Sequence, residues 1–323
     1  MSVDIETSHA VAPATAPTGS TSRALIIALA SAAAFGTSGP FAKELFSAGW
    51  SPAAAVTMRI GIAAAILAIP AARELRGRWY LLRTHLRAVL LYGLFGVAGG
   101  QLFYFLAVQH LSVGVALLLE YLSPTLLVLL AWARTRRAPS RLTLLGAVVA
   151  LAGLMLVLDV FGSVSVDAIG VVFGLGAAVC SATYFVVAAE TPEDGLSPLV
   201  LSGAGLAVGL VPLLLLGVTG ALPMHASTRS VPLAGWHVSV LVPVLGISVL
   251  AAAFAYVSGV VAARMLGTRV ASFVALAEVL FAVLFAWFFL GELPLPVQLV
   301  GGGLIVLGVV LVRAADRGDT LAD

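Results

Sequence analysis

The sequence predicts an all-α membrane protein with ten transmembrane helices, and three observations support this prediction. Of the 323 residues, 61% are hydrophobic and only 10% are charged, whereas a soluble domain carries about a quarter charged residues. The mean hydropathy is +1.11, and the apolar runs approach the ~20 residues that a spanning helix needs. These runs are continuous, whereas the strands of a membrane β-barrel alternate apolar and polar side chains. Helices are then the spanning elements, because lipid offers the backbone no hydrogen bonds.

Charged residues, prolines and glycines separate the ten predicted spans. Residues 1–22 are rich in Ala, Thr, Ser and Pro, a composition typical of a disordered tail, and we expect residues 314–323 to form a second short tail. In chain order, the predicted spans cover residues 24–46, 53–72, 86–109, 112–133, 141–158, 168–189, 197–219, 237–263, 268–290 and 296–313.

The basic residues predict how these spans are oriented, because cytoplasmic loops carry an excess of Lys and Arg. If the N-terminus is cytoplasmic, fourteen arginines fall on the cytoplasmic side and only Lys43 and Arg229 on the outer side, with Arg59 inside a span. We therefore expect a multi-pass protein of the cytoplasmic membrane with both termini in the cytoplasm. The fourteen are Arg23, Arg73, Arg76, Arg78, Arg83, Arg87, Arg134, Arg136, Arg137, Arg141, Arg264, Arg269, Arg313 and Arg317.

An internal repeat divides the chain. The segment LSVGVALLLEYLSPTLLVLLAW (111–132) aligns without a gap with LGTRVASFVALAEVLFAVLFAW (266–287), at an offset of 155 residues. Extra chain between the seventh and eighth spans accounts for a shorter offset of 146 residues earlier in the sequence. The aligned pairs include Trp132 with Trp287, Gly146 with Gly301, Gly153 with Gly308 and, at the shorter offset, Ser51 with Ser197.

The repeat predicts two halves, 23–159 and 168–313, with five spans each. An odd number of spans means that the two halves enter the membrane in opposite directions. Such inverted-topology repeats are an architecture of secondary transporters, whose substrate site lies near the membrane midplane between the repeats.

The two repeats resemble the EamA family of the drug/metabolite transporter superfamily over residues 24–313. The resemblance is carried by SAAAFGTSGPFAKEL (31–45) and by AEVLFAVLFAWFFLGELPLPVQLVGGGLIVLGVVLV (277–312). The spacing of Glu120 and Pro124 is similar to that of the threonine/homoserine exporters within the family, whereas Val279 departs from the Glu-Pro that many members carry in the ninth helix. The resemblance implies export or uptake of small metabolites by alternating access without ATP, and it does not identify the substrate.

Two carboxylates inside predicted spans are the strongest candidates for a site. Glu120 lies about 12 Å along its helix, near the midplane, at a rise of 1.5 Å per residue, where a charge costs at least ~2.5 kcal/mol and is rarely placed toward lipid. Glu278 lies at a similar depth and aligns with Ser123. Either acid would bind an ammonium group or carry a proton, and repulsion between them would favour one proton. Each is alternatively a neutral group that bonds neighbouring helices. Pro124 has no counterpart in the second repeat, so we expect a bend in the first half alone.

Other polar and aromatic residues recur at aligned positions and predict a shared lining. Arg59 would pair with a substrate carboxylate, or would snorkel to the interface or lock helices through backbone carbonyls. Gln101 and Tyr104 share a helix face, and Gln101 aligns with Tyr256. The expected lining is completed by Tyr184, Ser123, and the apolar walls Phe35 and Trp287. The alternative for these positions is aromatic packing and membrane-interface belts.

These features favour a secondary transporter that moves an amino-acid-like zwitterion outward. The alternatives are efflux of cationic or aromatic compounds, and a non-transporting membrane scaffold or lipid-handling protein. The sequence holds no P-loop, GxSxG or HExxH motif and no metal-ligand spacing of histidines, so we expect no enzyme activity, no cofactor and no metal. The expected partners are a small-molecule substrate, a proton as candidate coupling ion and the lipid bilayer, with no nucleic acid. We expect a monomer or weak dimer.

Overall fold

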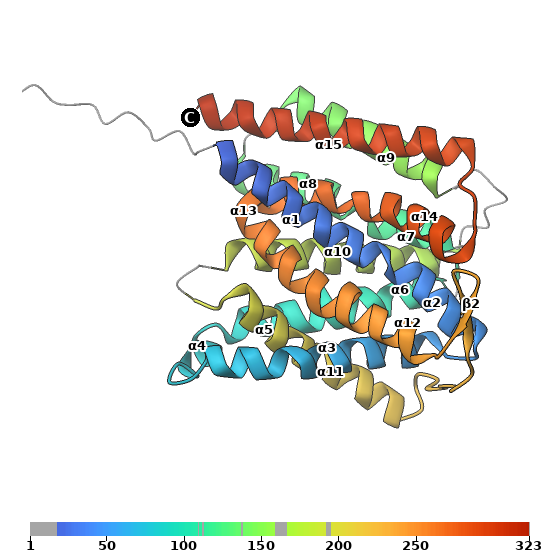
Figure 1. Cartoon of the computed structure of the whole chain (residues 1–323). Coiled ribbons are helices and arrows are strands. Elements are labelled where there is room, and N and C mark those ends of the chain that lie inside the picture. The colour runs from blue at the N-terminus through green and yellow to red at the C-terminus, as the bar shows by residue number, and fades with distance from the viewer. Residues whose placement is uncertain are drawn as a thin grey trace, which may run out of the picture.

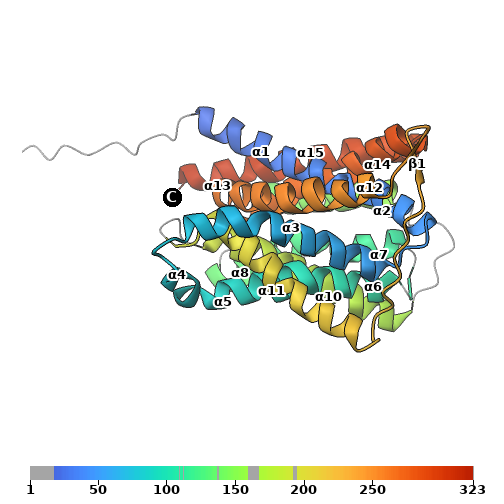
Figure 2. The ribbon, with the colours of Figure 1, turned by 60° about the horizontal axis from the view of Figure 1, so that its bottom comes forward.

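A computed structural model describes residues 18–108, 110–111, 113–136, 138–158, 167–191 and 195–322, and these are mostly helical. The helices form one bundle with a small hairpin at one end (Figures 1 and 2). The elements are α1 (Thr18–Gly36), α2 (Ser38–Ser47), α3 (Pro52–Glu74), α4 (Tyr80–Thr84), α5 (Leu86–Leu91), η1 (Tyr92–Gly99), α6 (Gly100–Val108), α7 (Val113–Glu120), α8 (Ser123–Thr135), α9 (Arg141–Val157), α10 (Ala168–Glu190), α11 (Pro198–Val218), β1 (Val231–Leu233), β2 (Trp236–Val238), α12 (Leu241–Leu245), η2 (Gly246–Phe254), α13 (Ala255–Ala275), α14 (Ala277–Leu290) and α15 (Pro296–Ala322).

Within the described residues, eight helical segments are long and apolar enough to cross a membrane, so the chain is a multi-pass membrane protein. Two shorter apolar helices, Arg141–Val157 and Ala277–Leu290, coincide with the fifth span and most of the ninth span expected from the sequence. One of the eight segments, Leu241–Ala275, covers 35 residues. It is interrupted at Gly267, whose φ of 75° and ψ of 166° are not helical, and this interruption falls where the sequence predicts a boundary.

Two packed groups of helices form the centre of the bundle. In the first, the α1 group, α1 and α2 pack against α13 and α14; in the second, the α10 group, α10 packs against α6, α7 and α8. The pair α9 and α15 runs along one edge of the bundle and the pair α3 and α11 along the opposite edge (Figure 1). Each group therefore combines the first span of one predicted repeat with later spans of the other.

The two edge pairs are each formed by helices at aligned positions of the predicted repeats, and both pairs are antiparallel. In α9 and α15, a Cβ on Gly153 would lie 2.5 Å from the Gly301 carbonyl oxygen, and one on Gly146 would lie 2.8 Å from that of Gly308. Only glycine permits this close backbone approach. The approach is reciprocal, because a Cβ on Gly301 would also meet the Gly153 carbonyl oxygen and one on Gly308 that of Gly146. A twofold axis between the two helices predicts such reciprocal contacts.

The two ends of the bundle differ. The start of α1, α4 and the end of α15 lie together at what we call the terminal end, and the β1–β2 hairpin lies at the opposite, hairpin end (Figures 1 and 2). The hairpin turns at Ala234 and Gly235, with φ of 51° and 79°, as a two-residue hairpin loop requires. It is anchored by the Ala234 amide, which donates to the Phe289 carbonyl at 2.8 Å.

Three sequence-based expectations about boundaries are wrong. The eighth span does not begin at residue 237, because His237 pairs with Pro232 in the hairpin and the helix starts at Leu241. Residues 314–322 continue α15 rather than forming a tail, and α1 begins at Thr18. The rest of the expected N-terminal tail, residues 1–17, lies outside the described residues.

Helix breaks occur at matched places in both halves, so the expectation of a bend in the first half alone is also wrong. The helix containing Glu120 is interrupted at Tyr121 and Leu122, and the one containing Glu278 is interrupted at Leu276. At both breaks the backbone tightens to bonds three residues apart, from Leu122 N to Leu119 O and from Leu276 N to Phe273 O, each 3.1 Å. The tightened turn therefore does not depend on proline. The π-helical segments η1 and η2 also coincide at the 155-residue offset, and such segments are frequent at functional sites.

Candidate functional site

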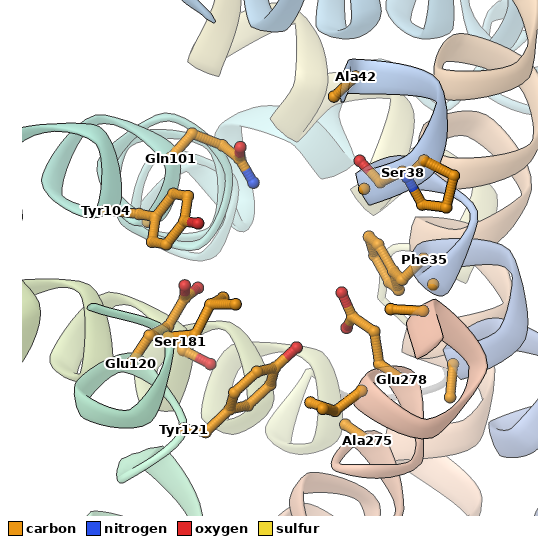
Figure 3. Close-up of a pocket in the computed structure, with 18 of the residues that line it drawn as sticks. Phe35, Ser38, Ala42, Gln101, Tyr104, Glu120, Tyr121, Ser181, Ala275 and Glu278 are labelled. Carbon is orange, nitrogen blue, oxygen red and sulfur yellow. The ribbon is translucent and has the colours of Figure 1, made fainter. Parts of the chain in front are cut away.

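A cavity of about 980 Å³ lies between the α1 group and the α10 group. Figure 3 shows Gln101, Tyr104 and Glu120 on one wall facing Phe35 and Glu278 on the other. The cavity brings together nine of the ten residues predicted from the sequence, namely Phe35, Arg59, Gln101, Tyr104, Glu120, Ser123, Tyr184, Tyr256 and Glu278.

The helix breaks position the two carboxylates. Glu120 is the last residue of α7, and Glu278 lies in the first turn of α14. Both side chains are half-buried and they face the cavity from opposite walls (Figure 3). Because backbone can depart from helix at membrane depth only where it is buried in protein or lines a cavity, the two breaks and the two acids define one polar centre.

Arg59 lines the same cavity but is committed to the protein. Its Nη1 donates to Ser38 Oγ at 3.1 Å and its Nη2 to the Ala251 carbonyl at 2.5 Å. Its guanidinium carbon lies 5.9 Å from the centre of the Phe35 ring, in cation–π range. Ala251 belongs to η2, so Arg59 braces a π-helical segment against α2. Of the three roles that the sequence suggested for Arg59, these contacts match the one in which the side chain locks helices through backbone carbonyls.

Trp287 is the predicted site residue that the cavity does not include, and its side chain is 49% exposed on the outer surface of the bundle. It lies nine residues after Glu278, and at 3.6 residues per turn nine residues rotate the side chain to the opposite face of the helix. Its placement as an apolar wall is therefore wrong.

Several lining residues were not predicted. Tyr121 points its hydroxyl toward Glu278 (Figure 3), because the break after Glu120 turns two consecutive residues toward the cavity. Ser181 precedes Tyr184 by three residues, a spacing that indicates a shared helix face, and its hydroxyl bonds that of Ser123 at 3.1 Å. Within the described residues, no three His, Cys, Asp or Glu side chains are grouped to hold a metal ion.

The cavity opens toward the hairpin end. Lining residues there, including Lys43, Glu292 and Leu293, are exposed, and Lys43 forms an ion pair with Glu292. Toward the terminal end the lining residues Ala28, Ala262 and Ala271 are buried. Aromatic rings form the floor, which includes Phe35 and Tyr256, with ring centres 5.1 Å apart, and Tyr184.

An apolar helical bundle with two carboxylates facing an internal cavity is typical of membrane transport proteins. The model of the EamA-like transporter family matches residues 22–159 and 168–314, and the chain belongs to this family.

Known proteins similar to the chain agree with this class. The threonine/homoserine exporter RhtA of Escherichia coli strain K12 is 28% identical over 235 residues, which cover 72% of this chain and 70% of the exporter. The exporter of the same name from Escherichia coli O157:H7 matches equally. A solved crystal structure of a protein with 18% sequence identity has a TM-score of 0.72 and covers 90% of this chain and 97% of its own, which shows a shared fold.

Proposed function

We propose that this chain is a secondary transporter that exports a small amino-acid-like metabolite across the cytoplasmic membrane by alternating access. The observation that carries the proposal is the pair Glu120 and Glu278, which face one cavity from opposite walls. Among the described residues, the exposed part of the lining lies at the hairpin end. Buried acids are costly in a membrane and mark substrate or ion pathways. The exporter RhtA, a relative by sequence, supports an amino acid as cargo and an outward direction.

The proposed topology has ten spans in two inverted repeats, 23–159 and 168–313, with both termini in the cytoplasm. Four observations support it: the antiparallel packing of α9 with α15 and α3 with α11, the matched π-helical segments, the matched helix breaks, and the interruption at Gly267. Most arginines of the loops lie near the terminal end, which the positive-inside rule places in the cytoplasm. The cavity would then open outward.

In this proposal the substrate ammonium binds between Glu120 and Glu278. Gln101, Tyr104 and Ser123 supply neutral polar contacts from the α10 group, while Phe35, Tyr184 and Tyr256 form the floor. Arg59 contributes positive charge at the wall through its fixed position rather than by a direct bond, since both terminal nitrogens already donate to the protein. A proton that replaces the substrate at the two acids would couple export to the proton gradient. The whole site lies within one chain, so it requires no second copy.

The second candidate function is efflux of cationic aromatic compounds, favoured by the rings of Phe35, Tyr104 and Tyr256 around the acids. A zwitterion needs a partner for its carboxylate, whereas a cation needs only the acids and rings. A scaffold or lipid-handling role would leave the two cavity-facing carboxylates without a purpose.

Transport by the purified protein in lipid vesicles separates these candidates. We expect preloaded unlabelled threonine or homoserine to drive counterflow of labelled threonine, and an amine that lacks the carboxylate to fail. Counterflow driven equally by aromatic amines would replace the first proposal with the second. An imposed pH gradient should raise the accumulation of threonine if a proton is the coupling ion.

A further inference from the structure

The seam between the α1 group and the α10 group is closed from the cavity floor to the terminal end. Tyr184 of α10 and Tyr256 of α13 meet across it with ring centres 5.9 Å apart. Tyr92 of η1, which is fully buried and lies outside the cavity, packs against Tyr184 at 5.4 Å. The seal is therefore built from side chains of both groups.

Three buried hydroxyls in this seal interact with one another and with no other polar side chain or backbone group among the described residues. They belong to Tyr92, Tyr184 and Ser202, and the Ser202 side chain lies beside that of Tyr92. Buried hydroxyls are almost always paired, and leaving one unpaired destabilises a structure. A buried row of hydroxyls whose only partners are one another indicates a surface that becomes solvated in another state of the protein.

The Tyr184 hydroxyl is held against the backbone of the opposite group. A Cβ on Gly259 of α13 would lie 2.2 Å from Tyr184 Oη, so glycine at this position allows the two groups to meet. Ser31 of α1, which also lines the cavity, bonds the Ala255 carbonyl of α13 at 2.8 Å. The hydroxyls of Ser31, Tyr184, Tyr92 and Ser202 thus lead from the cavity floor toward the terminal end.

Arg264 joins the two sides of this seam at the terminal end. Arg264 of α13 donates through Nη2 to the Leu196 carbonyl at 2.7 Å and through Nε to the Ala188 carbonyl in the last turn of α10 at 3.3 Å. A cation near the C-terminal carbonyls of a helix is stabilised by the helix dipole. These contacts must break if the two groups separate at this end.

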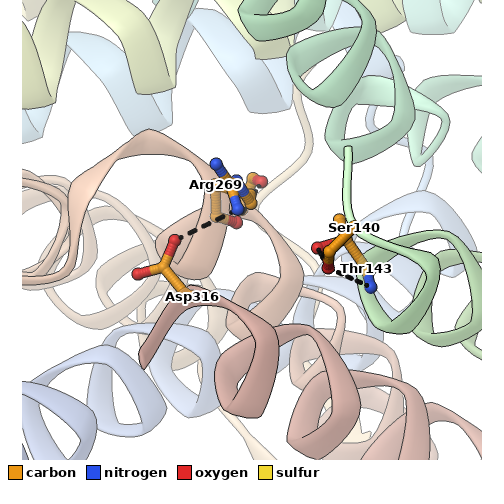
Figure 4. A network of polar contacts seen from close by, with 5 residues as sticks. Ser140, Thr143, Arg269 and Asp316 are labelled. Carbon is orange, nitrogen blue, oxygen red and sulfur yellow. Dashed lines mark hydrogen bonds and ion pairs between the residues drawn. The ribbon is translucent and has the colours of Figure 1, made fainter. Parts of the chain in front are cut away.

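Two further ion pairs of the described residues lie at the terminal end, and each joins other elements. Arg134 bonds Glu190 at 2.7 Å, and both belong to the α10 group. Arg269 of α13 contacts Asp316 of α15 at 3.4 Å, beside the Ser140 cap of α9 (Figure 4). Arg264 therefore differs from these arginines in the elements that it connects.

We propose, building on the proposed transport function, that this seam is the closed terminal-end half of the substrate path. The hydroxyls of Tyr184, Tyr92 and Ser202 line the path when it opens, and Arg264 is the latch that holds it closed. Arg264 acts as a positioning residue, because it lies outside the cavity and does not contact the substrate.

Thiol labelling tests the latch without any substrate. Ser202→Cys introduces a nearly isosteric reporter into the full-length chain, and Cys180→Ala removes the single native cysteine, which lies outside the cavity lining. A membrane-impermeant thiol reagent is applied to either face of oriented vesicles. Arg264→Gln removes the latch charge, and Arg134→Gln serves as the matched control at the same end.

We expect Arg264→Gln to raise the labelling rate of the reporter from the terminal side about tenfold, as befits the loss of charged hydrogen bonds, and Arg134→Gln to leave it within about twofold. If Arg264→Gln does not purify as a monodisperse protein, Arg264→Lys should raise the rate by a smaller factor. Equal labelling in the latch and control variants would overturn the latch, and faster labelling from the hairpin side would overturn the route. If the labelling rates are as expected but the protein transports no substrate in vesicles, the proposed transport function is refuted, whereas the proposal that Arg264 holds the seam closed stands.

Discussion

The α1 group and the α10 group contain the same features at aligned positions, yet they are braced differently. Position 59 in the first repeat is arginine, and the aligned position 205 in the second is glycine. Arg59 supports η2 and lines the open cavity, whereas Gly205 leaves room for the Tyr92 ring of η1, which fills the closed seam.

This difference shows how two repeats of nearly the same fold produce a cavity that is open at the hairpin end and closed at the terminal end. A Cβ at Gly205 would lie 2.3 Å from Tyr92 Cδ1, so the closed end depends on the absence of a side chain. The open end instead depends on a charged side chain that is only 7% exposed and whose terminal nitrogens bond two elements of the protein. The predictions below test each side of this comparison.

Replacing the brace should have the largest effect on stability. Arg59→Gln loses two hydrogen bonds from a charged donor and leaves the Ala251 carbonyl without this partner, a loss of about 3 kcal/mol. Unfolding of the purified protein by denaturant measures the change. The control Lys43→Gln removes an exposed ion pair with Glu292 and should cost less than about 1 kcal/mol. Equal losses in the two variants would show that Arg59 is not a brace.

Filling the space beside Tyr92 should have the next largest effect. Gly205→Ala introduces a methyl group against a rigid ring and should destabilise the protein by about 1–3 kcal/mol. At Gly61 a Cβ would meet the two methyl carbons of Leu210 at 3.6 and 3.7 Å, which are ordinary contacts, so Gly61→Ala should be neutral or slightly stabilising. If Tyr92→Leu restores the stability of Gly205→Ala, the clash with the ring is the cause; an unchanged loss would contradict it.

The two aromatic residues assigned as apolar walls should now behave differently. Phe35→Leu changes the floor of the cavity and should reduce threonine flux in vesicles several-fold. Trp287→Leu changes a side chain on the outer surface and should leave the flux unaltered. A larger loss in the Trp287 variant would contradict the orientation of α14.

The smallest effect is expected at the start of α10. Asp167 Oδ1 accepts a hydrogen bond from the Ile169 amide at 2.7 Å. This bond is the main reason why the pKa of Asp167 is lowered from its ordinary value of 3.8, and the hydrogen bond with His110 is the second. The resulting stabilisation is present above pH 3.8 and is lost as the pH falls through the lowered pKa. Asp167→Ala should therefore reduce the Tm slightly at neutral pH. A Tm difference that persists well below pH 3 would indicate a contribution other than the carboxylate.

Much of the architecture could be predicted because hydrophobic run length and the repeat are properties of the sequence itself. The glycine pairs show this, since Gly146 and Gly153 meet Gly308 and Gly301 in the two helices that the repeat aligns. The acids could be predicted for a similar reason, because a carboxylate in an apolar run is costly unless it faces a cavity.

The remaining features depend on tertiary packing that local sequence does not encode. The break at Leu276 has no proline or glycine beside it. The hairpin strands are only three residues long, and the apolar sequence of the second strand looks like the first turn of the span that follows it. Trp287 is instructive because its aligned partner Trp132 is also about half exposed, at 48%. The repeat therefore retains a tryptophan on the outer surface, where sequence alone suggested a cavity wall.

Threonine counterflow by the Glu120→Gln and Glu278→Gln variants tests the central claim most directly. Both substitutions keep the shape of the side chain and remove its ability to ionise at the polar centre of the cavity. With unchanged thermal stability as evidence of folding, each variant should lose counterflow almost completely if the two acids form one substrate site. Wild-type counterflow in both variants would contradict the site, and with it the account of how the two groups cooperate.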